Sequence, residues 1–282
     1  FLGILLMLAF CVLAPFGDSL AKLLGARIPL LELIVVRFGV QTVLLVPIVF
    51  LSGKTLAMSA RTFRLTVIRT LLHLVGSSAM YLSLRYLPIA DAIAIAFVMP
   101  FIMLVLGKTV LHEDVGNRRI AACGVGFVGT LLVVQPSFAT VGAPALLPLL
   151  VAVVFALFML VTRQIAKQAD PITLQATSGL VAMPVLAGLL FLGHVTGAPD
   201  LGLVIPARFD LALLLLIGVV GTVAHLLMTG SLRFAPSTTL APMQYLEIPF
   251  ATLLGWVIFN DLPNGLAAVG IAITVGAGLY II

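Results

Sequence analysis

The sequence predicts an all-α membrane protein with ten transmembrane helices, arranged as two inverted five-helix repeats. Three observations support this fold class. The chain of 282 residues is 62% hydrophobic and only 9% charged, whereas soluble domains carry about 25% charged residues. Apolar runs of about 20 residues, enough to cross ~30 Å of hydrocarbon, recur from one end to the other. A segment near residue 83 also reappears in the second half, which indicates a duplicated unit.

The duplicated segment is recognised by three matching features. It begins with Ser-Leu-Arg, an aromatic residue and, two positions later, a proline, at residues 83–88 and again at 231–236, a shift of 231 − 83 = 148 residues. A Pro-Phe pair follows in each copy, at Pro100 and at Pro249. Each copy ends on an acid, Glu113 and Asp261. We therefore expect one repeat over residues 1–136 and a second, inverted repeat over residues 142–282.

Helices are the expected form of the ten spans, because the apolar runs lack the alternation of apolar and polar residues that a barrel needs. The spans of the first repeat are expected at residues 1–21, 30–51, 67–84, 89–110 and 119–134. Those of the second are expected at 143–165, 172–193, 211–232, 237–259 and 266–282. Segments rich in Gly, Pro and polar residues at 53–55, 135–137 and 196–200 end helices between them.

The basic residues predict the orientation of these spans. Ten Lys and Arg side chains, Arg69 among them, lie in or beside the even-numbered loops. Four lie in or beside the odd-numbered loops, and Arg37 lies inside the second span. The excess of positive charge places the even loops and both termini in the cytoplasm. Because each repeat has an odd number of spans, the second repeat enters the membrane inverted, as in many secondary transporters.

These features resemble the drug/metabolite transporter superfamily, in its ten-helix form with two EamA-type halves. The tandem five-helix units, the Arg-aromatic-x-Pro turn, the Pro-Phe pair and the closing acid carry the resemblance, which covers essentially all 282 residues. The chain is similar in particular to bacterial amino-acid exporters of this superfamily. The resemblance implies a multi-pass protein of the bacterial inner (cytoplasmic) membrane. It also implies export of aromatic and other neutral amino acids, or related small metabolites, by alternating access.

Other substrates and another class of protein are the alternatives. The superfamily also transports drugs, cations, nucleotide sugars and triose phosphates, but phosphates favour several interior cations, and only Arg37 is clearly internal. An intramembrane enzyme should concentrate His, Asp or Glu residues in a loop at one membrane face, and no loop of this sequence does so. The sequence also lacks Gly-x-x-x-x-Gly-Lys, His-Glu-x-x-His and Gly-x-Ser-x-Gly motifs, so it does not support ATP-driven pumping, zinc hydrolysis or a nucleophilic serine. We therefore expect no enzymatic activity, no cofactor and no metal. The expected partners are a small-molecule substrate and the lipid bilayer, with no nucleic acid, and the expected state is a monomer.

Glu247 is the first candidate substrate-binding residue. It lies in the middle of the ninth span, and charged side chains inside a membrane are costly and usually functional. Gln244, three residues earlier, shares its helix face. A carboxylate at this position would hold a substrate ammonium group or exchange a proton. The alternative is a protonated or paired acid that serves packing alone.

A polar helix face occurs at the same place in both repeats. Ser77 and Tyr81 are four residues apart in the third span, and their counterparts 148 residues later are His225 and Thr229. Residues four apart lie on one helix face, so all four are candidate substrate-binding residues, and His73 extends the face by one turn. His225 is also a candidate proton carrier. The alternative is hydrogen bonding between helices.

The prolines point to the same region. Pro100 and Pro249 interrupt the fourth and ninth spans at matching places, and paired helix breaks are typical of transport sites in inverted repeats. Phe97, beside the first break, is a candidate for ring stacking with the substrate. A packing kink is the alternative. The sequence thus places the substrate near the membrane midplane, between the third, fourth, eighth and ninth spans.

Two further expectations concern packing. Arg37 is expected to form a structural ion pair with Glu32 or Asp18, or to extend toward the outer surface. The fifth and tenth spans are expected to pack on each other away from the cavity, because small residues repeat every four positions in both and allow close approach in lipid. The small residues are Ala122, Gly126 and Thr130 in the fifth span and Ala268, Ala272 and Gly276 in the tenth.

Overall fold

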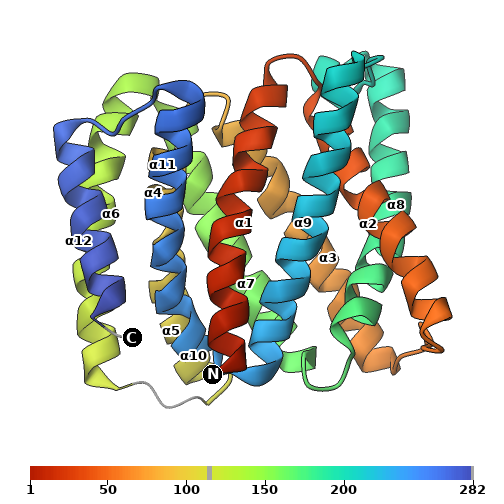
Figure 1. Cartoon of the computed structure of the whole chain (residues 1–282), viewed down its shortest axis with the longest axis horizontal. Helices are drawn as coiled ribbons and strands as arrows, with labels where there is room; N and C mark the ends of the chain where they lie inside the picture. Colours follow the sequence, from red (N-terminus) through yellow and green to blue (C-terminus); the bar gives the residue numbers. More distant parts are fainter. Residues whose placement is uncertain (113–115, 281–282) are drawn as a thin grey trace.

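The protein is a bundle of helices that stand side by side, with the N-terminus at one end of the bundle (Figure 1). The computed structural model describes residues 1–112 and 116–280, so Glu113, the acid that closes the first copy of the repeated segment, lies outside the described residues. Every regular element in the described part is helical, which confirms the all-α class. The α-helices are α1 (Leu2–Gly25), α2 (Leu30–Leu51), α3 (Ala60–Ser83), α4 (Ile89–Ala96), α5 (Met99–Thr109), α6 (Asn117–Val141), α7 (Leu147–Ile165), α8 (Pro171–Thr196), α9 (Arg208–Phe234), α10 (Ser237–Leu240), α11 (Glu247–Phe259) and α12 (Gly265–Leu279). The 3₁₀ helices are η1 (Ala143–Leu146), η2 (Pro199–Leu201) and η3 (Ala241–Leu246).

Eight helical segments of the described chain are long and apolar enough to cross a membrane. They correspond to the first eight predicted spans, with α4 and α5 together forming the fourth. The predicted ninth span is divided into α10, η3 and α11, and α11 has 13 residues. The predicted tenth span corresponds to α12, an apolar helix of 15 residues.

The fourth and ninth spans are each interrupted close to the proline that predicts a break there. α4 ends at Ala96 and α5 begins at Met99, which puts Pro100 in the first turn of α5. α11 begins at Glu247, which puts Pro249 in its first turn as well. Proline fits the first turn of a helix because the N–H that it lacks has no partner there. The two prolines therefore mark the starts of two half-helices rather than their ends.

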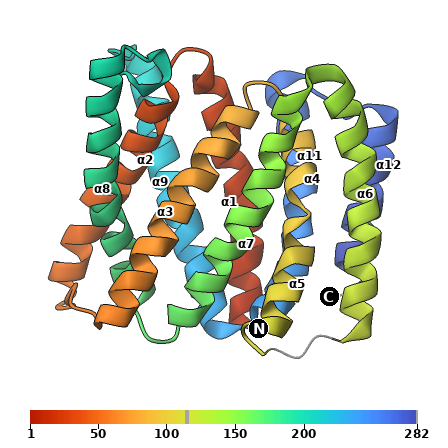
Figure 2. The ribbon, with the colours of Figure 1, turned by 180° about the vertical axis from the view of Figure 1, so that it is seen from behind.

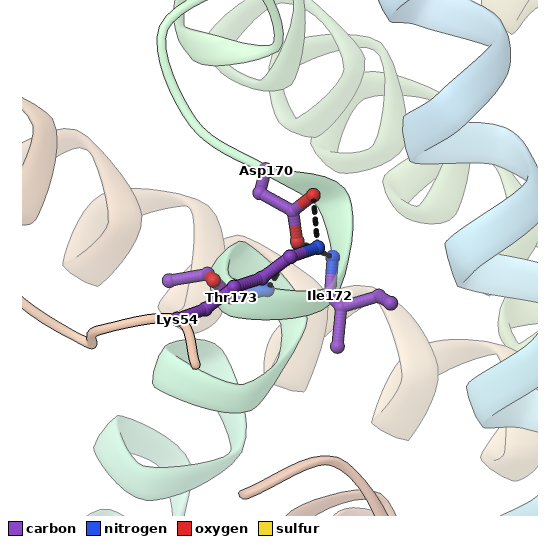
Figure 3. Close-up of polar contacts among 4 residues, drawn as sticks. All are labelled: Lys54, Asp170, Ile172 and Thr173. Carbon is purple, nitrogen blue, oxygen red and sulfur yellow. Dashed lines mark hydrogen bonds and ion pairs between the residues drawn. The ribbon is translucent and has the colours of Figure 1, made fainter. Parts of the chain in front are cut away.

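Polar contacts fix the start of α8 at the end of the bundle where the N-terminus lies, called here the N-terminal end. Asp170 accepts hydrogen bonds from the N–H groups of Ile172 at 3.1 Å and Thr173 at 3.2 Å (Figure 3). Lys54, from the loop after α2, donates to the same carboxylate at 2.7 Å. Burial by itself raises the pKa of the Asp170 carboxyl, but these hydrogen bonds outweigh it, so that this pKa lies below its ordinary value.

The start of α3 corrects one sequence-based assignment. Ser59 caps this helix by accepting a hydrogen bond from the N–H of Thr62 at 3.2 Å. The helix therefore begins at Ala60, seven residues before the predicted span (67 − 60 = 7). Arg69, which was counted among the residues beside a loop, lies inside this helix and is fully buried.

The two sequence halves interdigitate. The most extensive helix contacts join α1 to α9, α2 to α8, α3 to α7 and α6 to α12, so each joins the first half to the second. Figure 1 shows α1 beside α9, and Figure 2 shows α3 beside α7. The helices α2 and α9 also join the halves, and two glycines of α9 allow their close approach: a Cβ at Gly218 would lie 2.5 Å from Cβ of Val40, and one at Gly221 would lie 2.7 Å from Nε of Arg37. Such close approach is what drives helix association in lipid.

The helices α6 and α12 pack on each other at the edge of the bundle (Figure 1). A Cβ at Gly129 would lie 2.7 Å from the carbonyl oxygen of Gly270, and the Thr274 hydroxyl donates to the carbonyl of Gly126 at 3.3 Å. The contact between these helices and the buried small residues of α6 are as predicted, but the predicted stripe of α12 is wrong. Its residues, Ala268, Ala272 and Gly276, are exposed. Small residues occur on several faces of α12, so spacing alone does not select the face that packs.

Ion pairs also join the halves at both ends of the bundle. In each of the four formed by the described residues, the base comes from the first half and the acid from the second. At the N-terminal end the pair is Lys54–Asp170, at 2.7 Å. At the opposite end the pairs are Lys22–Asp261 at 2.7 Å, Arg27–Asp210 at 3.1 Å and Arg85–Asp200 at 2.7 Å.

Candidate substrate cavity

A cavity lies inside the bundle, with walls from α1, α2, α3, α4, α5, α7, α9, η3 and α11. It contains about 830 Å³ of space not occupied by atoms, its mouth included. Both halves of the chain contribute to it. Along α1 the lining runs from Phe10 to Asp18, eight residues (18 − 10 = 8), which is about 12 Å of helix.

Charged side chains gather in the part of the cavity farther from the N-terminal end. Asp18 of α1, Arg37 of α2 and Glu247 of α11 line it. The Arg37 guanidinium donates to the Ser77 hydroxyl at 2.5 Å and lies 5.9 Å from the centre of the Tyr81 ring. Asp18 interacts electrostatically with Arg37 and with Glu247. Within residues 1–112 and 116–280, neither carboxylate has a hydrogen-bond partner, so both are available to a ligand.

Aromatic and imidazole rings form the part of the cavity nearer to the N-terminal end. The His225 ring of α9 lies edge-on to the rings of Phe10 and Phe155, with centroids 6.0 Å and 5.9 Å away. His73 of α3 lies behind His225, and the two Nε2 atoms are 3.2 Å apart. One ring must therefore donate to the other. This contact joins α3 of the first half to α9 of the second.

Gln244 lies in η3, one turn before Glu247, and lines the same cavity. Its side chain is fully buried, and neither polar atom of its amide has a hydrogen-bond partner among the described residues. Phe97, after α4, also lines the cavity, and its ring centroid lies 5.3 Å from that of Tyr245. Buried amides almost always have partners, so the Gln244 amide requires an explanation.

Arg69 occupies the space on the N-terminal side of the histidine pair. It donates to the hydroxyls of Thr162 at 2.8 Å, Ser178 at 2.8 Å and Thr229 at 3.0 Å. Its guanidinium also lies 4.5 Å from the centre of the Phe158 ring. None of the described carboxylates forms an ion pair with it. The three hydroxyls come from α7, α8 and α9, so one cation ties α3 to three helices of the second half.

The structure brings together most of the predicted substrate-binding residues. Those that line the cavity are Ser77, Tyr81, Phe97, His225, Gln244 and Glu247. His73 and Thr229 do not line it, because His73 contacts His225 from behind and Thr229 accepts a hydrogen bond from Arg69.

Asp18 and Arg37 also line the cavity, although neither is among the substrate-binding residues predicted from the sequence. Arg37 is buried and does not reach the surface. Glu32, its other proposed partner, accepts instead from a backbone N–H in the loop before α9. A charged residue inside an apolar span is a signal of function, and it would have selected both residues. Phe10 and Phe155 carry no such signal, because phenylalanine occurs throughout the apolar spans.

Comparisons with known proteins find relatives that match nearly the whole chain. The model of the EamA-like transporter family matches residues 1–135 and 143–282. The S-adenosylmethionine uptake transporter of Rickettsia prowazekii is 26% identical over 280 residues, which cover 99% of this chain and 92% of the relative. The riboflavin transporter of Rhizobium johnstonii is 30% identical over 213 residues, or 76% of this chain and 68% of the relative. The pseudopaline exporter of Pseudomonas aeruginosa is 24% identical over 274 residues, or 95% and 91%. One solved crystal structure, 19% identical, superposes with a TM-score of 0.71 over 99% of this chain and 94% of that chain, which shows the fold alone.

Proposed function

The chain belongs to the EamA-like transporter family, and we propose that it is a secondary transporter for small zwitterionic metabolites that carry an α-amino-acid group and one further positive charge. Its relatives are transporters of small metabolites and not enzymes, and the chain is a multi-pass membrane protein. S-adenosylmethionine, which appears in the name of the Rickettsia relative, is a metabolite of this kind. It is the substrate that we propose to test first.

The charge of the cavity is the observation that carries this proposal. Two carboxylates that have no hydrogen-bond partner in the described part of the chain, those of Asp18 and Glu247, face the cavity together with one guanidinium, that of Arg37. A neutral amino acid supplies one ammonium and one carboxylate, and would leave one cavity carboxylate unpaired. A substrate with an added cation, such as a sulfonium, pairs all three side chains. An unpaired charge in a low dielectric costs several kcal/mol, so the cavity favours the substrate with the added cation.

The arrangement of the halves supports transport by alternating access. We infer ten membrane crossings in two inverted repeats, with α4 and α5 together forming one crossing and α10, η3 and α11 another. Half-helices begin at corresponding prolines in both repeats, as in carriers with a midplane site. Opening either end must separate the ion pairs that join the halves there. We further infer from the distribution of basic residues that both termini lie in the cytoplasm, and we propose that the chain is a monomer in the bacterial inner membrane.

The direction of transport follows the substrate gradient in this proposal. The resemblance to amino-acid exporters favours export, whereas the relatives include both an uptake transporter and an exporter. A counterflow experiment measures carriage without assuming a direction.

The test uses purified protein in sealed liposomes that are loaded with unlabelled S-adenosylmethionine. Entry of the labelled compound by counterflow is the expected result. S-methylmethionine should inhibit it more strongly than methionine, because both have the amino-acid group and only the former has a sulfonium. Glu247→Gln and Asp18→Asn should reduce this preference, whereas Glu32→Gln, at a buried acid outside the cavity, should keep it. Equal inhibition by methionine and S-methylmethionine in the wild type would contradict the proposal.

A further inference from the structure

We propose that the cavity contains a second subsite, in which Gln244 binds the edge of a planar nitrogen heterocycle, and that a 6-aminopurine is the favoured ring. The inference rests on the proposed function, because it assigns this ring to the metabolite whose amino-acid group binds at Asp18, Arg37 and Glu247. It adds a residue that selects for the ring, which the charges of the cavity do not do.

The first observation is the state of the Gln244 amide. The side chain is fully buried and lines the cavity, yet its Nε2 and Oε1 atoms have no hydrogen-bond partner in the described part of the chain. An amide of this kind offers one donor and one acceptor side by side in a plane. Burying both without a partner is unfavourable, so a ligand that supplies the complementary pair would bind here with little competition from the protein.

The second observation is the position of this amide relative to the charged groups. Gln244 lies in η3, three residues before Glu247, and η3 directly follows α10, which lies at the N-terminal end of the bundle (Figure 1). It therefore lies on the N-terminal side of Glu247, away from Asp18 and Arg37. The thiol of Cys11 donates to the carbonyl of Met243, which holds η3 against α1. The charged groups and the amide are thus at different levels of a cavity that spans about 12 Å along α1.

The third observation is the nature of the wall at the level of the amide. Phe10, Phe97 and Phe155 line this part of the cavity together with the His225 ring. Aromatic side chains bind planar rings by offset stacking or edge-to-face contact. The combination of an apolar, ring-lined wall with one planar amide suits a heteroaromatic ring better than an aliphatic side chain.

Hydrogen-bond geometry selects the class of ring. Glutamine pairs with adenine through two hydrogen bonds, accepting from the exocyclic amino group and donating to the adjacent ring nitrogen. Phenylalanine and aliphatic amino acids have no such edge. The isoalloxazine ring of riboflavin does present a neighbouring N–H and carbonyl, so it is the second source of the same chemistry, and the experiment separates the two.

Gln175 provides a matched control. It is also a fully buried glutamine whose two amide atoms have no hydrogen-bond partner among the described residues, but it lies in α8 and does not line the cavity. The backbone carbonyl oxygen of Gln175 accepts from the side-chain amide of Gln41 at 2.8 Å, so this residue belongs to the contact between α2 and α8. The substitution Gln175→Met removes the same group from a place that a cavity ligand does not reach.

The test compares ligands that share the charged groups and differ in the ring. Inhibition constants of S-adenosylmethionine and S-methylmethionine are measured by competition in liposomes for the wild type, Gln244→Met and Gln175→Met. Gln244→Met should raise the constant of S-adenosylmethionine about tenfold or more, as expected for loss of a two-bond contact to a base. It should change the constant of S-methylmethionine less than twofold, and Gln175→Met should change neither. Gln244→Leu serves as a second variant, and both are compared with the wild type for monodispersity in detergent.

Binding of adenosine and riboflavin to the detergent-purified protein, followed by thermal stabilisation, separates this inference from the proposed function. If adenosine stabilises the wild type and Gln244→Met abolishes this stabilisation, the purine subsite is supported. A failure of S-methylmethionine to compete would refute the charged-group proposal and leave the purine subsite standing. Stabilisation by riboflavin and not by adenosine would overturn the choice of a purine. If Gln244→Met weakened the binding of S-adenosylmethionine and S-methylmethionine equally, or weakened neither, the ring subsite itself would be overturned.

Discussion

Arg69 allows a prediction that runs against the usual expectation for a buried arginine. Its three hydrogen-bond acceptors are hydroxyls, at 2.8 Å, 2.8 Å and 3.0 Å, and no described acid neutralises it. Thr229→Val keeps the shape of the side chain and removes one acceptor from the cation. A hydrogen bond to a charged group contributes about 1.5–3 kcal/mol, so this substitution should lower the free energy of unfolding by about 2 kcal/mol.

Removing the charge itself should cost less than removing one of its acceptors. In Arg69→Met the hydroxyls lose a donor but keep their own proton to donate, as Thr162 already does to the carbonyl of Phe158 at 2.7 Å. Replacing buried charged groups by apolar ones of similar size is often neutral or stabilising. We therefore expect Arg69→Met to lie within about 1 kcal/mol of the wild type.

The assay is thermal unfolding in one detergent, with each variant compared with the wild type. At about 2–4 °C per kcal/mol for a chain of 150–250 residues, Thr229→Val should lower the Tm by about 4 °C or more. Thr252→Val is the matched control, because the buried hydroxyl of Thr252 has no hydrogen-bond partner among the described residues, and it should leave the Tm unchanged or higher. A greater loss of Tm for Arg69→Met than for Thr229→Val would refute the reasoning and show that the guanidinium is itself net stabilising.

Three further outcomes are expected. Gly129→Ala should destabilise the α6–α12 contact by about 1–3 kcal/mol, because its Cβ would lie 2.7 Å from the carbonyl oxygen of Gly270. Gly276 has open space around it, so Gly276→Ala should be neutral. Melting temperatures of the two variants measure the difference. Gly221→Ala should displace Arg37, since the Cβ of the alanine would lie 2.7 Å from Nε of Arg37. This substitution should therefore raise the KM of a carboxylate-bearing substrate in counterflow, and an unchanged KM would contradict the role of that guanidinium. Asp170→Asn should cost a few tenths of a kcal/mol at pH 7, because the ion pair is partly exposed. Since the pKa of the folded Asp170 carboxyl is lowered, this contribution is fully present above the ordinary carboxyl pKa of about 4 and is lost as the pH falls through the lowered value. Thermal unfolding between pH 7 and pH 3 measures this dependence.

The helices, and the location of the cavity near the proline-marked breaks, could be predicted because they depend on local sequence. Apolar run length predicted the first eight membrane-crossing segments, and the prolines predicted where α5 and α11 begin. The shared face of Gln244 and Glu247 also follows from spacing, and both line the cavity. These features require no knowledge of which helix packs against which.

The remaining features depend on contacts between helices. Arg69, His73 and Ser77 are spaced four apart on α3, and periodicity treats them as one face, yet only Ser77 lines the cavity. The face is longer than the cavity, so its part nearer to the N-terminal end of the bundle packs against α7, α8 and α9 instead. The role of Arg37 likewise depends on Ser77 of another helix, which no local pattern reveals.

The distribution of charge in the ion pairs has a consequence for how such a chain is assembled. Every ion pair between the described residues of the two halves has its base in the first half and its acid in the second. A pair of first halves would lack the four aspartates of these ion pairs, and a pair of second halves would lack the four bases, so neither could form them. The four ion pairs therefore favour the mixed combination. Separately synthesised fragments should accordingly recombine as one of each kind, and neither fragment should substitute for its partner.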